Sequence, residues 1–172
     1  MTNVEASLTR QAMWLMLGLL VVRIIFAYVP PMGVDEAYAV AAARGYSLSF
    51  FDHPPVTFNA ALLAGEVLGR ETPFVFRLPT IFFGTVAAWM MWKIGLALGG
   101  ARVGLWTLGL YTASPAMALS GVYIGPDAAL NAGTTVSVYW LIRIVQAGRD
   151  APLRWWIWVG LSLGFALASK YQ

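Results

Sequence analysis

Asp35 and Glu36 form a pair of adjacent carboxylates in the run VDEAY. The alanine-rich residues that follow favour a helix, and Gly45 favours its end. Two interpretations of Asp35 stay open: it satisfies free N–H groups at the helix start, or it acts as a general base or metal ligand. Tyr38 would share a helical face with Asp35, because residues three apart are neighbours on a helix.

The second polar group is Asp52-His53, which stands between two phenylalanines and a double proline. His53 is the only histidine of the chain. Pro55 suits the first position of a following helix. The pair is either a solvated turn or part of a pocket shared with Asp35, where an acid and an imidazole bind a metal or contact a phosphate. Asp35, Asp52 and His53 are the residues that could bind a divalent metal, and no other cofactor is expected.

Three cations and one more acid complete the groups that suit an anionic substrate. Arg77 lies in the run FRLP, and Lys170 lies near the C-terminal end. Arg23 lies within an apolar stretch, where an ionisable group is either functional or snorkels to the interface. Asp127 follows a proline, a position typical of a helix start, so helix capping is its alternative role. Arg77 and Lys170 are either interfacial anchors or contacts to a phosphate.

The composition identifies the surroundings of these groups as a lipid bilayer. Hydrophobic residues make up 59% of the chain and charged residues 11%, whereas a soluble domain carries about 25% charged residues. Several apolar stretches approach the roughly 20 residues that cross a bilayer, and a chain of 172 residues is too small to hide them all. The many aromatic residues suit a protein with two membrane interfaces.

The composition also excludes two kinds of site. The net charge of +3 is small and the basic residues are scattered, so no nucleic-acid partner is expected. The chain contains no cysteine, which excludes disulfides and thiolate metal sites.

The sequence predicts an all-α integral membrane protein with about five transmembrane helices, in one domain over 1–172. A long first outer loop, 30–73, contains short helices that lie in the membrane interface. Glycine, proline and polar residues make the turns between the spans. The predicted spans are about 11–29, 74–98, 103–124, 127–145 and 155–171.

The positive-inside rule places the N-terminus in the cytoplasm, because most basic residues then lie on the inner side. With this orientation, anionic chemistry is concentrated at the outer face. The acids predicted to lie outside are Asp35, Glu36, Asp52, Glu66, Glu71 and Asp127.

Six motifs, in order, resemble those of GT-C membrane glycosyltransferases of the protein mannosyltransferase and aminoarabinose transferase superfamily. The resemblance covers nearly the whole chain from Arg23 onward. It implies a sugar donor on polyprenyl or dolichyl phosphate, and inverting transfer on the outer face to a protein, lipid or envelope-glycan hydroxyl. The motifs are VDEAY, FDHPP, FRLP, SP at 114–115, PDA at 126–128 and SKY at 169–171.

The resemblance also implies roles for individual residues. Asp35 would be the catalytic base that takes the acceptor proton, and Glu36 would support it. Asp52 and His53 would match an acidic-then-basic pair before the prolines, although some members have Glu-Lys there. The substrate-binding residues would be Asp52, His53, Arg77, Asp127, Lys170, Tyr38 and Arg23.

The resemblance further implies a bacterial inner membrane, with the Asp35 loop in the periplasm or outside the cell. Family members are several times larger, so the chain is predicted to be the N-terminal part of a larger enzyme. The expected partners are a polyprenyl-phosphate sugar, membrane lipids and the acceptor. Two other functions stay open: a non-catalytic module that binds polyprenyl phosphate, and a small transporter using Arg23 and Asp127 as a relay.

Overall fold

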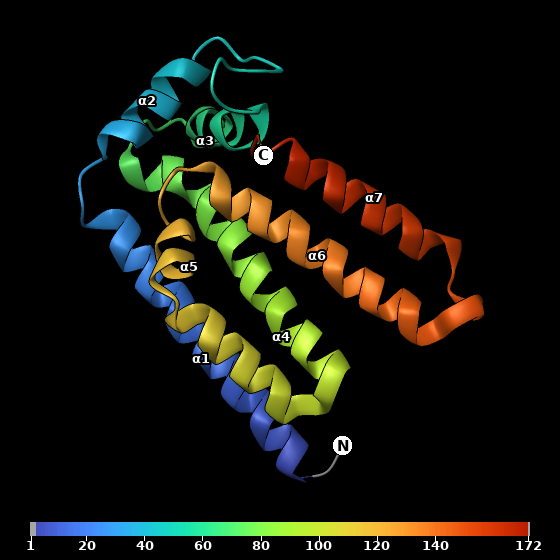
Figure 1. Ribbon diagram of the computed structural model, residues 1–172. Coiled ribbons are helices and arrows are strands. Elements are labelled where there is room, and N and C mark those ends of the chain that lie inside the picture. Colours follow the sequence, from blue (N-terminus) through green and yellow to red (C-terminus); the bar gives the residue numbers. More distant parts are fainter. Residues whose placement is uncertain (1–2, 172) are drawn as a thin grey trace.

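The computed structural model describes residues 3–171, which are almost entirely helical and contain no strand (Figure 1). Three helices, α1, α4 and α6 with the short helix after it, are long and apolar enough to cross a membrane. The prediction of an all-α membrane protein is confirmed. The elements are α1 (Asn3–Tyr28), α2 (Val34–Ala43), α3 (Pro55–Leu68), α4 (Pro73–Ala113), α5 (Pro115–Ser120), α6 (Pro126–Ala147), the 3-10 helix η1 (Gly148–Asp150) and α7 (Leu153–Leu167).

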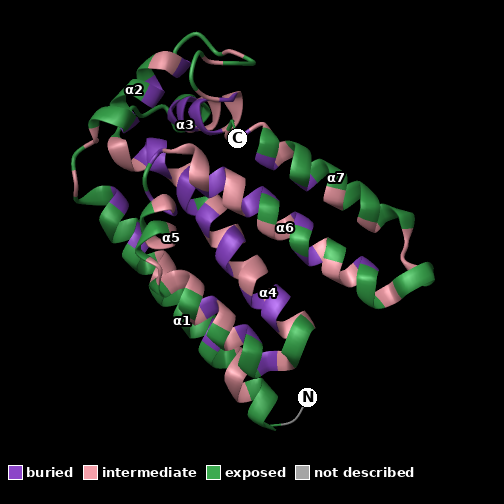
Figure 2. Ribbon diagram, viewed as in Figure 1, coloured by how far each residue is buried: buried purple, intermediate pink, exposed green. Residues whose placement is uncertain are grey.

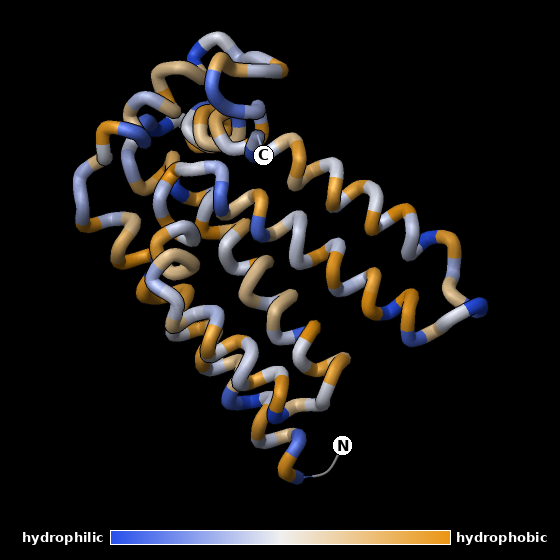
Figure 3. The backbone as a smooth tube through the Cα atoms, viewed as in Figure 1, coloured by the Kyte–Doolittle hydropathy of each residue, from blue (hydrophilic) through white to orange (hydrophobic). Residues whose placement is uncertain are grey.

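The long helices lie side by side, and α2 and α3 cover one end of the bundle (Figure 1). We call this the α2–α3 end; the N-terminus lies at the opposite end. Figure 2 shows that buried residues concentrate on α4, whereas α1 and α7 are largely exposed. The exposed side chains of α1 are mostly apolar, as the orange segments in Figure 3 show. An apolar outer surface is what a bilayer requires.

The segments predicted as the second and third spans form two arms of α4, which reverses direction at Gly99 and Gly100. Gly100 has φ 79°, a left-handed conformation that glycine adopts without steric cost. The two arms then pack closely along small residues. A Cβ on Gly95 would lie 2.7 Å from the Cα of Gly104, so a side chain there would push the arms apart.

The second arm of α4 is shorter than the span predicted at 103–124, because it ends at Ala113. Pro115 has no N–H to continue the helix, and it holds Ser114 in an extended conformation with ψ 121°. The chain then forms the short helix α5 and a non-helical connection over 121–125. This connection continues to the α2–α3 end, where α6 begins (Figure 1).

Two other helices differ in length from the predicted spans. α1 begins at Asn3, before the span predicted from 11 onward. α7 has 15 residues and ends at Leu167, whereas the predicted span continued to 171. A helix of that length extends only about 22 Å, less than the roughly 30 Å hydrocarbon core.

The connection after α5 packs directly on Arg23. A Cβ on Gly121 would lie 2.6 Å from the Cζ of Arg23, and Arg23 itself is only 2% exposed. We therefore expect Gly121→Ala to lower stability by about 1–3 kcal/mol through overpacking. The measurement is the thermal unfolding temperature of the purified chain in detergent.

The matched control is Gly109→Ala, because a Cβ on Gly109 would meet nothing within 4 Å. Alanine is the better helix former, so this variant should be neutral or slightly stabilising. Equal unfolding temperatures for the two variants would contradict the close packing of Arg23 on Gly121.

Candidate functional site

Four segments that are distant in sequence meet at the α2–α3 end. The N–H of Val56 donates to the carbonyl of Ala168 at 3.3 Å, which joins the start of α3 to the chain after α7. The hydroxyls of Ser49 and Tyr171 lie 2.7 Å apart. The connection over 121–125 reaches α2 through Ile124. Most of the residues predicted to be functional lie on these segments.

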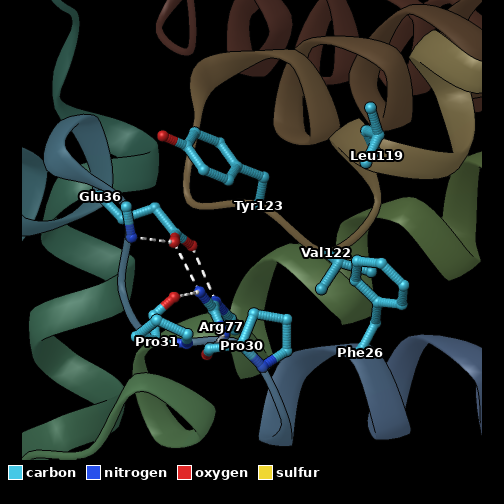
Figure 4. A pocket seen from close by; sticks show the side chains of 9 residues that line it. Phe26, Pro30, Pro31, Glu36, Arg77, Leu119, Val122 and Tyr123 are labelled. Atoms are coloured by element: carbon cyan, nitrogen blue, oxygen red, sulfur yellow. Dashed lines mark hydrogen bonds and ion pairs between the residues drawn. The ribbon is translucent and has the colours of Figure 1, made fainter.

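Glu36 and Arg77 form a buried ion pair at the centre of this end (Figure 4). Nε of Arg77 donates to Oε1 of Glu36 at 2.8 Å, and one terminal nitrogen donates to Oε2 at 2.6 Å. The Arg77 side chain is 4% exposed and the Glu36 side chain is 0% exposed. The parallel bonds make a bidentate pair, the strongest geometry for arginine and carboxylate.

Every hydrogen-bonding position of the Arg77 guanidinium is filled within the chain. Besides Glu36, it donates at 2.9 Å to the carbonyls of Ala27, Pro30 and Pro31. The Ala27 carbonyl lies in the last turn of α1, where a helix leaves oxygens without partners, and the Pro30 and Pro31 carbonyls lie in the connection to α2. An arginine has five N–H donors, so none is left for a substrate phosphate.

Glu36 is saturated in the same way. Besides two bonds from Arg77, it accepts from the N–H of Gly33 at 2.9 Å and of Ile124 at 3.0 Å. Burial alone would raise the pKa of Glu36, but the hydrogen bonds from Arg77, Gly33 and Ile124 outweigh burial and lower this pKa. The anionic form of Glu36 is therefore favoured, and its four acceptor positions are filled within the chain.

Asp35 lies next to Glu36 in sequence, but its side chain is exposed. The N-cap of α2 is Gly33, so Asp35 lies in the first turn and does not cap the helix. The hydroxyl of Tyr123 donates to Oδ2 of Asp35 at 3.5 Å. Asp35 thus has at least one oxygen open to a substrate hydroxyl.

Tyr123 is a site residue that the sequence analysis did not identify. It lines a cavity of about 150 Å³ beside Glu36 and Arg77, and a second cavity of about 500 Å³ beside Ser120 and Asp127. Burial, followed by the charges of Asp35 and Glu36, raises the pKa of its hydroxyl. The residue lies between two glycines that interrupt an apolar stretch, and this interruption is the sequence signal for a turn.

Asp127 and Lys170 form an ion pair at the second cavity. Nζ of Lys170 donates to Oδ1 of Asp127 at 2.7 Å, and both side chains are partly exposed. Asp127 does not cap α6, whose N-cap is Gly125. A lysine ammonium has three donors, so Lys170 keeps two for another anion.

Asp52 and His53 form a separate group with Tyr38. The hydroxyl of Tyr38 donates to Oδ1 of Asp52 at 3.0 Å, and Nδ1 of His53 lies 3.1 Å from Oδ2. His53 lowers the pKa of Asp52, and the bond from Tyr38 contributes to the same shift. The imidazole stacks on Phe58 with ring centroids 5.0 Å apart. Since Tyr38 is one helical turn from Asp35, the group of Asp52, His53 and Tyr38 lies next to Asp35.

The predicted metal ligands are not assembled as a metal site. Within residues 3–171, no group of three or more histidine, aspartate or glutamate side chains could hold a metal ion. Asp35 accepts from Tyr123, whereas Asp52 accepts from Tyr38 and lies 3.1 Å from Nδ1 of His53. In this conformation the three residues do not converge on one position, and a divalent metal bound by them stays a prediction.

Arg23 is a predicted substrate-binding residue that, within residues 3–171, makes no hydrogen bond or ion pair with the other predicted site residues. It is buried against Gly84 and Gly121, and its hydrogen bond to Thr85 is long at 3.4 Å. Its Nε has no partner among the described residues. The side chain is only 2% exposed in this conformation, and a substrate-binding role for Arg23 stays a prediction.

Residues 52–172 match the family described as dolichyl-phosphate-mannose-protein mannosyltransferase. The chain belongs to this family. A search of curated proteins and a search of solved structures each found no match. The family match begins at Asp52, after Asp35 and Glu36, and the Glu36–Arg77 pair connects this earlier segment to the matched region.

The saturated ion pair gives a direct test of this arrangement. We expect Glu36→Gln to lower the stability of the chain by about 3 kcal/mol, because it leaves the buried Arg77 charge without its counterion. The measurement is thermal unfolding of the purified chain in detergent.

The control is Arg44→Gln, which breaks the Arg44–Glu71 pair on the same end of the molecule. Both of those side chains are more than half exposed, so water replaces the lost contact and little change is expected. A Glu36→Gln variant as stable as Arg44→Gln would show that the buried pair does not hold this end together.

Proposed function

We propose that this member of the mannosyltransferase family transfers a sugar from a polyprenyl-phosphate donor to an acceptor hydroxyl, with Asp35 as the general base. The observation that carries the proposal is the contrast between two adjacent acids. Glu36 has every acceptor position filled, whereas Asp35 is exposed beside a tyrosine that lines two cavities. A base needs an oxygen that is free to take a proton.

In the proposed reaction, the acceptor oxygen attacks the anomeric carbon of the sugar while Asp35 takes its proton. The new carbon–oxygen bond forms as the bond to the phosphate oxygen breaks, and the lipid phosphate leaves with the electron pair. Attack opposite to the leaving group inverts the anomeric centre. No oxidant or further reactant is needed.

Lys170 is the proposed contact to the leaving phosphate. Negative charge develops on that phosphate as the bond breaks, and a fixed cation lowers the barrier. The ammonium is held by Asp127 at the 500 Å³ cavity and is about two-fifths exposed. Arg77 takes no direct part because its donors are occupied. The outer face of a bacterial inner membrane is the proposed location, and its lipid, glycan or protein hydroxyls are the proposed acceptors.

The test is transfer of labelled sugar from polyprenyl-phosphate mannose by the purified chain in lipid nanodiscs. Asp35→Asn should reduce turnover at least 100-fold while donor binding is retained, because general-base catalysis contributes about 10²–10⁴. The control Asp150→Asn makes the same change in η1, at the far end of α6 (Figure 1), and should leave turnover unchanged.

The outcomes separate the proposal from its alternatives. Full turnover by Asp35→Asn would overturn the base assignment. Donor binding by the unmodified chain without any turnover would favour a non-catalytic module. No observation favours a transporter, because Arg23 contacts Thr85 and Asp127 contacts Lys170, and the two do not form a relay.

A further inference from the structure

One cation at the α2–α3 end has no acidic partner. Within residues 3–171, the guanidinium of Arg70 makes no ion pair or side-chain hydrogen bond. Its nearest acid in the sequence, Glu71, is bound by Arg44, and Glu66 accepts from Tyr46 at 2.6 Å. Three other cations of this end are paired with carboxylates, namely Arg44 with Glu71, Arg77 with Glu36 and Lys170 with Asp127.

Arg70 borders a cavity of about 610 Å³ between the end of α1 and the start of α4. The rest of the lining is mainly apolar and includes Tyr28, Leu68, Phe74 and Leu78. The rings of Tyr28 and Phe74 meet edge to face at 6.0 Å. An unpaired cation beside apolar side chains suits a ligand that carries an anion and a hydrocarbon part.

An apolar cavity of about 430 Å³ lies farther along the same two helices. Phe82 lines it from α4, two helical turns after Phe74, and Leu17 lines it from α1, three turns before Tyr28. Residues separated by whole turns share one face of a helix. The two cavities therefore lie along one side of the α1–α4 pair.

We propose that this side of α1 and α4 binds a membrane phospholipid. Its phosphate contacts Arg70, and one acyl chain runs along the helices into the apolar cavity at Phe82. Phe82 lies about 12 Å below Phe74 at 1.5 Å per residue. That depth is within the roughly 15 Å thickness of one leaflet. One phospholipid can therefore place its head group at the cavity beside Arg70 and an acyl chain in the cavity beside Phe82.

The phospholipid site is separate from the proposed sugar-transfer site. The 610 Å³ cavity is lined by neither Tyr123 nor Asp127, which line the 500 Å³ cavity. The proposed phospholipid therefore binds the α1–α4 surface and is not the sugar donor. Loss of this lipid and loss of sugar transfer are measured independently.

The experiment titrates the purified full chain in detergent with phosphatidylglycerol and counts bound lipid by native mass spectrometry. Arg70→Gln should weaken binding about fivefold, because one cation near a membrane phosphate contributes about 1 kcal/mol. Arg44→Gln removes one positive charge from the same end, but Arg44 is paired, so the affinity should stay within about twofold of the unmodified chain.

Two further measurements identify the source of the bound phosphate. Phe82→Ser should also weaken phosphatidylglycerol binding, because Phe82 is 62% exposed toward the proposed acyl chain. Inorganic phosphate at millimolar concentration should not displace the lipid. Equal losses in Arg70→Gln and Arg44→Gln, displacement by inorganic phosphate, or the absence of any bound phosphatidylglycerol would each overturn the proposal.

Discussion

The buried ion pair between Glu36 and Arg77 holds the α2–α3 end of the molecule together. Isolated charges in a low-dielectric interior cost several kilocalories per mole, and a pair is stable there only when its remaining hydrogen-bonding positions are also satisfied. Here they are: Arg77 also holds the carbonyls at the end of α1, and Glu36 also holds the amides of Gly33 and Ile124. One pair thus joins α1, α2, α4 and the connection before α6.

The pair also provides hydrogen-bond partners for backbone groups, which apolar side chains could not do. The chain between α1 and α2 contains Pro30 and Pro31, which have no N–H, while their carbonyls and that of Ala27 need donors. Arg77 supplies these donors, and Glu36 binds the amide of Gly33 at the start of α2, as the acid of a capping box does. Replacing the pair by packed hydrocarbon would leave these groups unsatisfied.

The sequence predicted the membrane class, the short helices of the first loop and the turn between the spans at 74–98 and 103–124, because each follows from local composition. It did not predict the partner of Glu36, since Arg77 is 41 positions away and its pairing depends on how α1, α2 and α4 meet. Tyr123 was missed because its apolar neighbours resemble a continuing span. Only the break at Pro115 brings this tyrosine back to Asp35.

The same geometry explains why two neighbouring acids differ so much. Successive residues of a helix point about 100° apart, so a carboxylate aimed at the buried Arg77 leaves its neighbour on the exposed side of α2. Glu36 is fixed by four hydrogen bonds, which fixes the first turn of α2 and hence the backbone of Asp35. The chemistry proposed for Asp35 therefore depends on an ion pair whose hydrogen-bonding positions are all filled within the chain. Glu36 thus fixes the backbone on which the proposed base, Asp35, is carried.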